Sequence, residues 1–374
     1  VNSGDNFYNY SYDIVLNKKI FPNVSSNRLV RKAQNFVNVS GQKWLKEQTY
    51  LRHRDLHDVY IFMWDGFLPE KTEDYEYLKR KGKKIISLFL GSDIRHISAF
   101  TQEYGLDTST WEKWFHVTDI NRQLFRLRKA ELFSDAIFSV PDQSGLSLRP
   151  YYKIYIPFDA RSVSFNVPRR EVPRIVHIPS RSGIKGTSFI LEALEELKKE
   201  KVQFEFEFIS GVPNEIVLEK LQDADILIDE IYLHGPGTLS LEGIASGCAV
   251  ATKTIKGEAY EEVICNIDLD NLKEKIRRLI QDMDYRVRLA TEGRKLIKSI
   301  NDPIRIVGNM LKIAGTSPTS NDYDYCPTFF SEKYQLNEGV DISFKNKQLT
   351  KRIVEEFKLA DGLNIKRMQK EGLI

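Results

Sequence analysis

A loop with two cations is the first feature of this sequence that could do chemistry. The segment Ile175–Lys185 (IVHIPSRSGIK) reads as a buried strand followed by a loop that carries Arg181 and Lys185 on either side of Gly183. Guanidinium and ammonium groups bind phosphate oxygens through charge-assisted hydrogen bonds, and glycines let the backbone approach the same anion. Taken alone, this loop reads equally well as a solvated basic turn.

A glycine-rich turn later in the chain favours the phosphate interpretation. Within Ala224–Gly247, a predicted strand leads to Gly235 and Gly237, and a predicted helix follows at once and contains Glu242. The first N–H groups of a helix have no partner inside the helix and favour anions. A carboxylate inside the helix can accept hydrogen bonds from ribose hydroxyls. Together the two segments indicate a site for a nucleoside diphosphate.

Competing phosphate and hydrolase motifs are missing from the sequence. It contains no G-x-G-x-x-G after an early strand and no G-x-x-x-x-G-K-[ST], which disfavours a nicotinamide enzyme and a P-loop ATPase. It also contains no G-x-S-x-G and no H-E-x-x-H. The cysteines Cys248, Cys265 and Cys326 have no metal-binding spacing, so we expect a reducing compartment and no structural zinc.

Length and composition indicate a globular protein of two domains with an appendage. The chain has 374 residues, of which 41% are hydrophobic and 29% charged. Its net charge of +3 makes nucleic acid an unexpected partner. The residues up to Arg161 carry 24 basic against 19 acidic side chains, a mild excess that suits either an anionic surface or solvent. No apolar run approaches the ~20 residues that cross a bilayer, so we expect a cytoplasmic protein.

Predicted strands and helices alternate with short connections, which is typical of a doubly wound parallel sheet. In the first half we predict strands at 59–64, 84–90 and 135–140 and helices at 73–80 and 121–133. In the second half we predict strands at 174–178, 204–209, 225–229 and 249–252 and helices at 187–200, 214–222, 239–246, 272–280 and 285–300. Ligands of such sheets bind beyond the carboxyl ends of the strands, where both loops lie.

This alternation of strands and helices predicts a first α/β domain at 1–165, a second at 166–315 and an extension at 316–374. Asn166–Pro173 is the expected linker, and Tyr12–Leu16 is a candidate first strand unless the true start lies upstream. In the extension, Glu332–Ser343 resembles Glu355–Lys366 at an offset of 23 residues. We interpret these copies either as two small helix–turn units packed on the body or as a contact for a partner.

The helix predicted over Asn121–Phe133 combines basic and apolar residues. Such a helix can lie on anionic lipid, which would give peripheral contact with the inner face of a membrane. An ordinary amphipathic helix that covers the sheet through its apolar side is the favoured alternative.

Several runs resemble one family. PSRSGIKGTSFILEALEEL, ISGVPNEIVLEKLQDADILIDE and GTLSLEGIASGCAV are similar to the nucleotide-sugar domain of retaining GT-B glycosyltransferases. A bacterial subgroup carries an H-x-P-S…KGT signature, which here is His177, Pro179, Ser180 and Lys185–Thr187. Upstream, LKRKGKKIISLFLGSDIRH resembles the acceptor-domain segment of the same subgroup. The resemblance extends from about Asp58 to Ala314.

The resemblance implies a GT-B fold, with two Rossmann-like domains facing across a cleft and a helical C-terminal extension. It assigns catalytic roles to Arg181 and Lys185 at the donor diphosphate and to Glu242 at the ribose. Of the family's paired glutamates, the first falls on His234, which departs from the pattern. The remaining residues expected to bind the donor are Ser180, Gly183, Gly235, Gly237, Thr238 and Leu239. On the acceptor side we expect Asp93, Arg95 and His96, next to Leu90 where the subgroup usually has histidine.

The implied activity is transfer of a hexose, with retention and without a metal, from a UDP- or GDP-type sugar that serves as substrate. No cofactor is expected. The implied acceptor is a glycan or a lipid-linked glycan in cell-surface polysaccharide synthesis. Two alternatives stay open: a non-catalytic subunit that binds nucleotide sugar or glycan, motivated by His234 and Leu90, and a nucleotide-sugar epimerase of the same fold.

Overall fold

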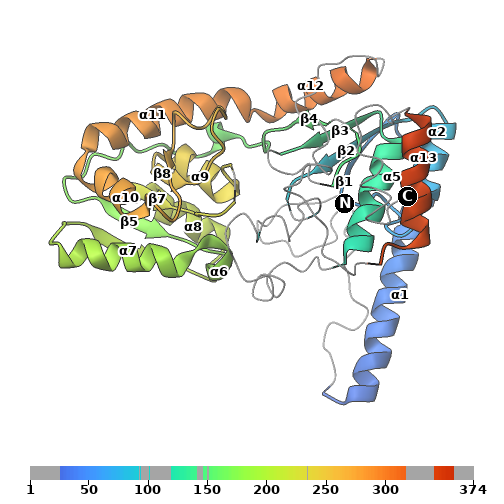
Figure 1. Cartoon of the computed structure of the whole chain (residues 1–374), viewed down its shortest axis with the longest axis horizontal. Coiled ribbons are helices and arrows are strands. Elements are labelled where there is room, and N and C mark those ends of the chain that lie inside the picture. The colour runs from blue at the N-terminus through green and yellow to red at the C-terminus, as the bar shows by residue number, and fades with distance from the viewer. Residues whose placement is uncertain are drawn as a thin grey trace.

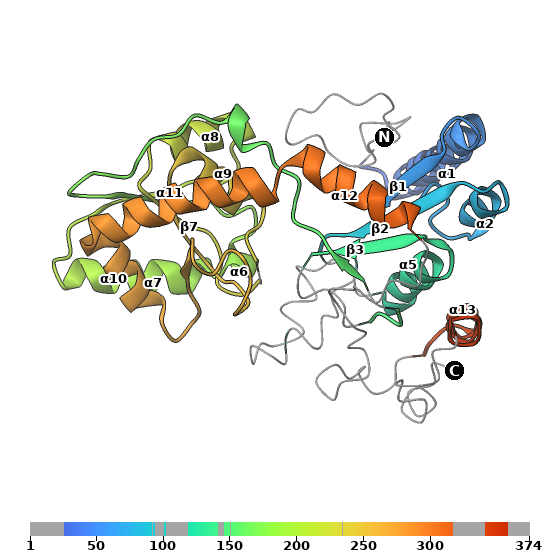
Figure 2. The ribbon, with the colours of Figure 1, turned by 90° about the horizontal axis from the view of Figure 1, so that it is seen from above.

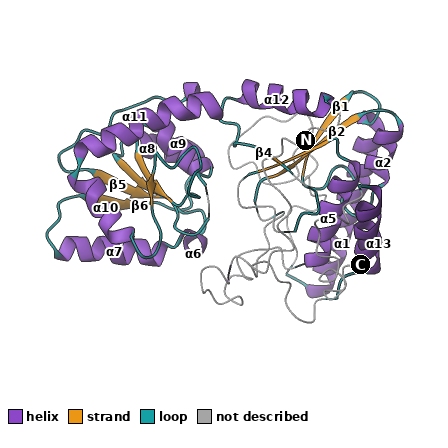
Figure 3. Cartoon of the chain, turned by 45° about the horizontal axis from the view of Figure 1, so that its top comes forward, coloured by secondary structure: helices purple, strands orange, loops and turns teal. Residues whose placement is uncertain are grey.

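The structure is a computed structural model that describes residues 26–91, 93, 101, 119–140, 146–149, 151–233, 235–316 and 341–357. These residues form two α/β domains side by side (Figure 1). Each domain contains its own parallel sheet, and no described strand belongs to both. The strands of the two sheets appear as separate fans in Figure 3.

The first domain has four described strands in the order β1-β2-β3-β4, all parallel. They are β1 (Val59–Met63), β2 (Lys84–Phe89), β3 (Ala136–Ser139) and β4 (Tyr152–Lys153). β2 and β3 are near-continuous apolar runs because helices cover both faces of a parallel sheet. The carboxyl ends of these strands therefore meet at one edge of the domain.

Helices from distant parts of the chain cover the two faces of this sheet. On one face lie α2 (Glu73–Arg80) and α5 (Ile120–Phe133), and α13 (Phe344–Glu356) packs beside α5. On the other face α12 (Pro303–Gly315) places Ile306, Met310 and Ala314 against β2 and β3. Figure 2 shows α12 lying across these strands, in line with α11 of the second domain. Helices α12 and α13, from the last part of the described chain, thus complete the first domain.

The second domain has five described parallel strands in the order β6-β5-β7-β8-β9. They are β5 (Arg174–His177), β6 (Glu205–Phe208), β7 (Ile226–Ile228), β8 (Ala249–Thr252) and β9 (Cys265–Asn266). β6 is an edge strand, as its alternating Phe and Glu predict. The strand order reverses between β5 and β7, and such a switch point is where an open α/β sheet binds its ligand.

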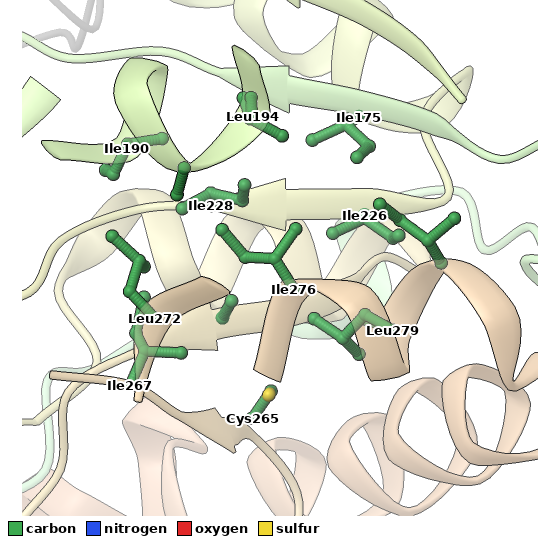
Figure 4. Close-up of a cluster of buried hydrophobic side chains, with 14 of the residues drawn as sticks. Ile175, Ile190, Leu194, Ile226, Ile228, Cys265, Ile267, Leu272, Ile276 and Leu279 are labelled. Atoms are coloured by element: carbon green, nitrogen blue, oxygen red, sulfur yellow. The ribbon is translucent and has the colours of Figure 1, made fainter. Parts of the chain in front are cut away.

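This sheet is also covered on both faces. α7 (Thr187–Lys199) and α10 (Leu272–Gln281) pack on one face through an aliphatic cluster, where Ile190 and Leu194 meet Ile226 and Ile276 (Figure 4). α8 (Asn214–Gln222), α9 (Thr238–Ser246) and α11 (Met283–Ile300) pack on the other face. The short helices α6 (Ser182–Lys185) and η1 (Ala160–Ser162) lie in connecting loops.

The structure departs from the expected organisation in two places, the end of the second domain and the linker. α12 lies within the predicted second domain but packs on the sheet of the first, so by packing the second domain ends with α11. The expected linker Asn166–Pro173 is bound to the second domain, because the Asn166 N–H donates to the Ser246 carbonyl at 2.9 Å and Arg170 pairs with Asp223 and Asp225.

The structure also differs from two expectations for the first and last parts of the chain. For residues up to Gln42, the sequence predicts no element except the strand candidate Tyr12–Leu16, which lies outside the described residues. Here α1 (Arg28–His53) is a helix of 26 residues, with Asn27 as its N-cap. In the extension, the described helix α13 spans the segment between the two repeat copies and the first two residues of the second copy, and most of both copies lies outside the described residues.

Candidate functional site

The loop after β5 is held by a buried histidine. The ring Nδ1 of His177 lies 2.7 Å from the Ile228 carbonyl, which only accepts, so Nδ1 donates. Its Nε2 then accepts from the Thr187 hydroxyl at 2.8 Å. Burial lowers the pKa of His177 and keeps the ring neutral. The H-x-P-S…KGT signature therefore joins β5, β7 and the start of α7.

Gly186 sets the direction of this loop. Its φ of 71° lies in the left-handed region, and a Cβ there would lie 2.4 Å from the Ile231 side chain. Glycine alone satisfies both constraints. As a result, Lys185 in α6 points toward the carboxyl end of β7, while Arg181 at the N-cap of α6 stays exposed.

Lys185 is the centre of a buried ion cluster. Its ammonium lies 2.7 Å from Asp229 Oδ1 and 3.0 Å from Glu230 Oε2, at the end of β7. Burial alone would lower the pKa of Lys185, but the two carboxylates outweigh it and raise that pKa. Lys185 is thus always charged, and its charge is already shared by two partners.

α9 begins directly beside this cluster. Its N-cap is Gly237, which offers no side chain to the first N–H groups of the helix. The Ser240 hydroxyl donates to Asp229 Oδ2 at 2.5 Å, which fixes the carboxylate below the helix start. One turn further on, Glu242 is buried and accepts from Asn214 Nδ2 at 2.9 Å. Burial raises the pKa of Glu242, against the effect of Asn214.

A cavity of about 210 Å³ connects these groups at the carboxyl ends of β5 and β6. Among the expected residues, Ser180, Lys185, Thr238, Leu239 and Glu242 line it. Arg181 is exposed, and neither it nor Gly183 is among the lining residues. A cation, an open helix start and a carboxylate therefore face one space, although the sequence assigned two cations to it.

A second cavity of about 110 Å³ lies between the two domains. The first domain contributes Leu90 and Val140, from the ends of β2 and β3, and the second contributes Glu230 and Gly235–Gly237. This is the cleft that the predicted fold class requires. Lys153 of β4 and Glu258 of the second domain form an ion pair near it.

The structure places Asp93, expected on the acceptor side, inside its own turn. This residue is buried, and its carboxylate accepts from the backbone N–H groups of Leu90 at 3.0 Å and Gly91 at 2.6 Å. Asp93 therefore holds its own turn instead of facing the cleft. Arg95, His96 and the donor-side His234 lie outside the described residues.

Of the two interpretations of Asn121–Phe133, the favoured one, a helix that covers the sheet, is confirmed, and this helix gives no support to lipid binding. Arg126, Arg128 and Lys129 of α5 are buried and pair with Asp65, Glu131 and Asp74, respectively. The helix covers the sheet and is itself covered by α13. No described helix combines the length and apolar character that crossing a membrane needs.

Sequence reasoning missed Asp229, Glu230 and Asn214 as site residues. The signal for the first two was available, because two adjacent carboxylates directly follow a predicted central strand, at the sheet edge where ligands bind. Asn214 had no such signal, since its contact with Glu242 spans 28 residues of sequence.

No family model and no curated protein matches this sequence. Solved structures do match. Sucrose-phosphate synthase from Thermosynechococcus elongatus is similar over 78% of this chain and 81% of its own, with 11% identity and a TM-score of 0.50. Trehalose-6-phosphate synthase OtsA is similar over 78% of each chain, with 10% identity and a TM-score of 0.50.

A third match is TarM of S. aureus, in complex with fondaparinux, alpha-GlcNAc-glycerol and UDP. It covers 74% of this chain with 11% identity and a TM-score of 0.48, and this chain spans 59% of its length. At such identities, likeness establishes the fold alone. The chain has the GT-B fold of glycosyltransferases, as the resemblance predicted, with two Rossmann-like domains facing across a cleft and a helix of the extension packed on the first.

Proposed function

We propose that the protein is a glycosyltransferase that takes its sugar from a nucleoside diphosphate sugar bound in the second domain. The observation that carries the proposal is the open start of α9, which shares a cavity with Lys185 and Glu242 at the switch point of the sheet. Helix starts at such positions bind phosphates. The GT-B fold supports the same conclusion.

Each group near the cavity has a role in this proposal. The diphosphate lies at the N–H groups of Thr238 and Leu239, where the helix dipole favours negative charge. Lys185 contacts a phosphate oxygen while Asp229 and Glu230 hold it in place. Arg181, exposed at the rim, supplies the second positive charge when the donor is bound. Glu242, oriented by Asn214, accepts from the ribose hydroxyls.

In the proposed reaction, the bond between the anomeric carbon and the diphosphate breaks and a bond to an acceptor oxygen forms on the same face of the sugar. The hydroxyl proton of the acceptor moves to an oxygen of the departing diphosphate. Lys185 and the start of α9 stabilise the charge that develops there, each contributing about 3–4 kcal/mol. Retention in this scheme needs no base from the protein.

The acceptor enters from the first domain, at the cleft lined by Leu90 and Val140. We propose a glycan or lipid-linked glycan, with a UDP- or GDP-type donor, in cell-surface polysaccharide synthesis. A reducing, cytoplasmic location is consistent with Cys248 and Cys265, which are free and buried in the described part of the chain.

A second candidate function is nucleotide-sugar binding without transfer. The motivating observation is the ion cluster, because two carboxylates already neutralise the ammonium of Lys185. In that case the cavity would hold a nucleotide sugar but would stabilise the leaving diphosphate poorly.

Thermal unfolding with UDP-, GDP-, ADP- and CMP-sugars tests the proposal, followed by an assay for released nucleotide. We expect one diphosphate class to raise the melting temperature and to be hydrolysed slowly without acceptor. Glu242→Gln should weaken both effects, whereas Glu207→Gln, on edge strand β6, should leave both unchanged. If no nucleotide sugar raises the melting temperature, the proposal is wrong. Binding without release, even when glycan acceptors are supplied, would favour the second candidate.

A further inference from the structure

Helix α1 packs on its domain along only part of its length. Its last turns pack on the body, where Tyr50 is buried with its ring 5.8 Å from that of Phe67 and Glu47 pairs with Lys71 at 3.0 Å. Its first turns extend beyond the rest of the first domain (Figure 1). The helix is therefore anchored at one end and projects at the other.

The apolar side of α1 faces away from the protein. Leu29, Phe36, Trp44 and Leu51 follow one another at steps of seven or eight residues, which places them on one side of a helix. Their exposures are 77%, 73%, 61% and 49%, respectively. An amphipathic helix that served only its own domain would bury this stripe, so the arrangement points to an interaction surface outside the domain.

The charges of α1 indicate what that surface is. The helix contains six lysines and arginines and a single acidic residue, Glu47. Arg28, Lys32, Lys43 and Lys46 form a second stripe at helical spacing, beside the apolar one. An apolar stripe with Trp and Phe, flanked by basic residues, is a feature of helices that lie in the interface of an anionic bilayer.

We propose that α1 docks the protein on a negatively charged lipid surface, with Phe36 and Trp44 inserted between headgroups. This goes beyond the proposed transferase activity and is independent of the donor site. A second copy of the chain fits this face less well. In the best heptad register, Val37, Trp44 and Leu51 alternate with Ser40 and Glu47, which would put polar groups in the core of a coiled coil.

The test is co-sedimentation of the whole chain with vesicles, without nucleotide. We expect binding to phosphatidylcholine vesicles that contain phosphatidylglycerol, weaker binding to phosphatidylcholine alone, and a loss of binding at high salt. Trp44 should emit at shorter wavelength on binding, and Trp44→Phe should remove that change while it keeps most of the binding.

Matched variants identify the surface. Phe36→Ser with Trp44→Ser should weaken vesicle binding roughly tenfold or more. Ile304→Ser with Phe344→Ser changes two side chains that are 80% and 74% exposed on α12 and α13 and should leave binding unchanged. Both double variants should fold, because every altered side chain is largely exposed.

Three results would overturn the proposal. The wild-type chain could fail to sediment with the anionic vesicles. The control pair could weaken binding as much as the α1 pair. Finally, ultracentrifugation could show a dimer that Phe36→Ser with Trp44→Ser dissociates, which would make this face a protein interface. None of these results bears on nucleotide binding in the second domain, which is measured separately.

Discussion

The two domains follow one plan but use their buried charges differently. In the first domain, the ammonium of Lys129 lies 2.7 Å from the carboxylate of Asp74 beneath α5, and the carboxylate of Asp93 accepts hydrogen bonds from the backbone of its own turn. In the second, Lys185 and its two carboxylates adjoin a cavity and an open helix start. A buried ion pair therefore does not identify a site. What sets the second domain apart is the cavity and, beside it, a helix start without a side-chain cap.

The pKa values of Lys129 and Lys185 shift in opposite directions, which also distinguishes the two domains. Burial lowers the pKa of Lys129 and raises that of Asp74, so desolvation outweighs the attraction of a single partner. At Lys185, two carboxylates outweigh desolvation and raise the pKa. In the second domain, Lys185 thus stays protonated beside the cavity, with both carboxylates as its partners.

The largest effect is expected from removing either lysine. Lys185→Ala and Lys129→Ala each leave carboxylates buried without their cation and should lower the free energy of unfolding by about 3–5 kcal/mol, measured with denaturant. Neutralising the partners, with Asp229→Asn and Glu230→Gln or with Asp74→Asn, should restore most of the stability.

The rate of sugar transfer should then distinguish the role of Lys185 from that of Lys129. The stability-restored Lys185 variant should remain about a hundredfold slower in sugar transfer, whereas the restored Lys129 variant should turn over normally. Equal losses of turnover in both variants would show that the cluster at Lys185 is as purely structural as the pair beneath α5.

Gly186→Ala tests the loop that positions Lys185. The added methyl would meet Ile231 at 2.4 Å and the backbone has a φ of 71°, so we expect a loss of about 1–3 kcal/mol in thermal or chemical unfolding. Gly82→Ala, in the first domain, has a φ of 68° but nothing within 4 Å of the new carbon. It should cost about 1 kcal/mol or less, and an equal cost at both positions would argue against the close contact.

Glu242→Gln should weaken nucleotide binding without unfolding the domain. The amide keeps an oxygen for Asn214, and its neutrality removes the cost of burying a charge, which raises the pKa of Glu242 in the wild type. Loss of a charge-assisted hydrogen bond to ribose should cost about 1.5–3 kcal/mol of affinity, measured by calorimetry. Unchanged affinity would remove the ribose role from this residue.

The smallest effect concerns pH. Because the pKa of His177 lies below its ordinary value of 6.5 in the folded state, the unfolded chain binds more protons as the pH falls. The contribution of His177 to stability is therefore full above about pH 6.5 and is lost below it. Urea unfolding should show a steeper decline toward acid pH for the wild type than for His177→Gln. Parallel curves would contradict the buried neutral ring.

The sequence predicted strands and most helices because long apolar runs and helical periodicity are local properties. The predicted α2, α8 and β8 agree with the structure at both ends. The sequence did not predict α1, because its apolar stripe is exposed and does not pack in a core. It also did not predict α12, which packs on a sheet more than 150 residues earlier in the chain. For the site, it located both loops but paired Arg181 with Lys185, whereas the structure pairs Lys185 with Asp229 and Glu230.

By itself, the sequence determined the α/β class, the doubled architecture and the two loops at the carboxyl ends of the strands, since each depends on residues close together in the chain. Only the tertiary structure decided which charges are neutralised, which face a cavity and which helix turns its apolar side outward. Those properties depend on burial and on contacts between distant segments, such as Asn214 with Glu242 and α13 with α5. No local pattern encodes them.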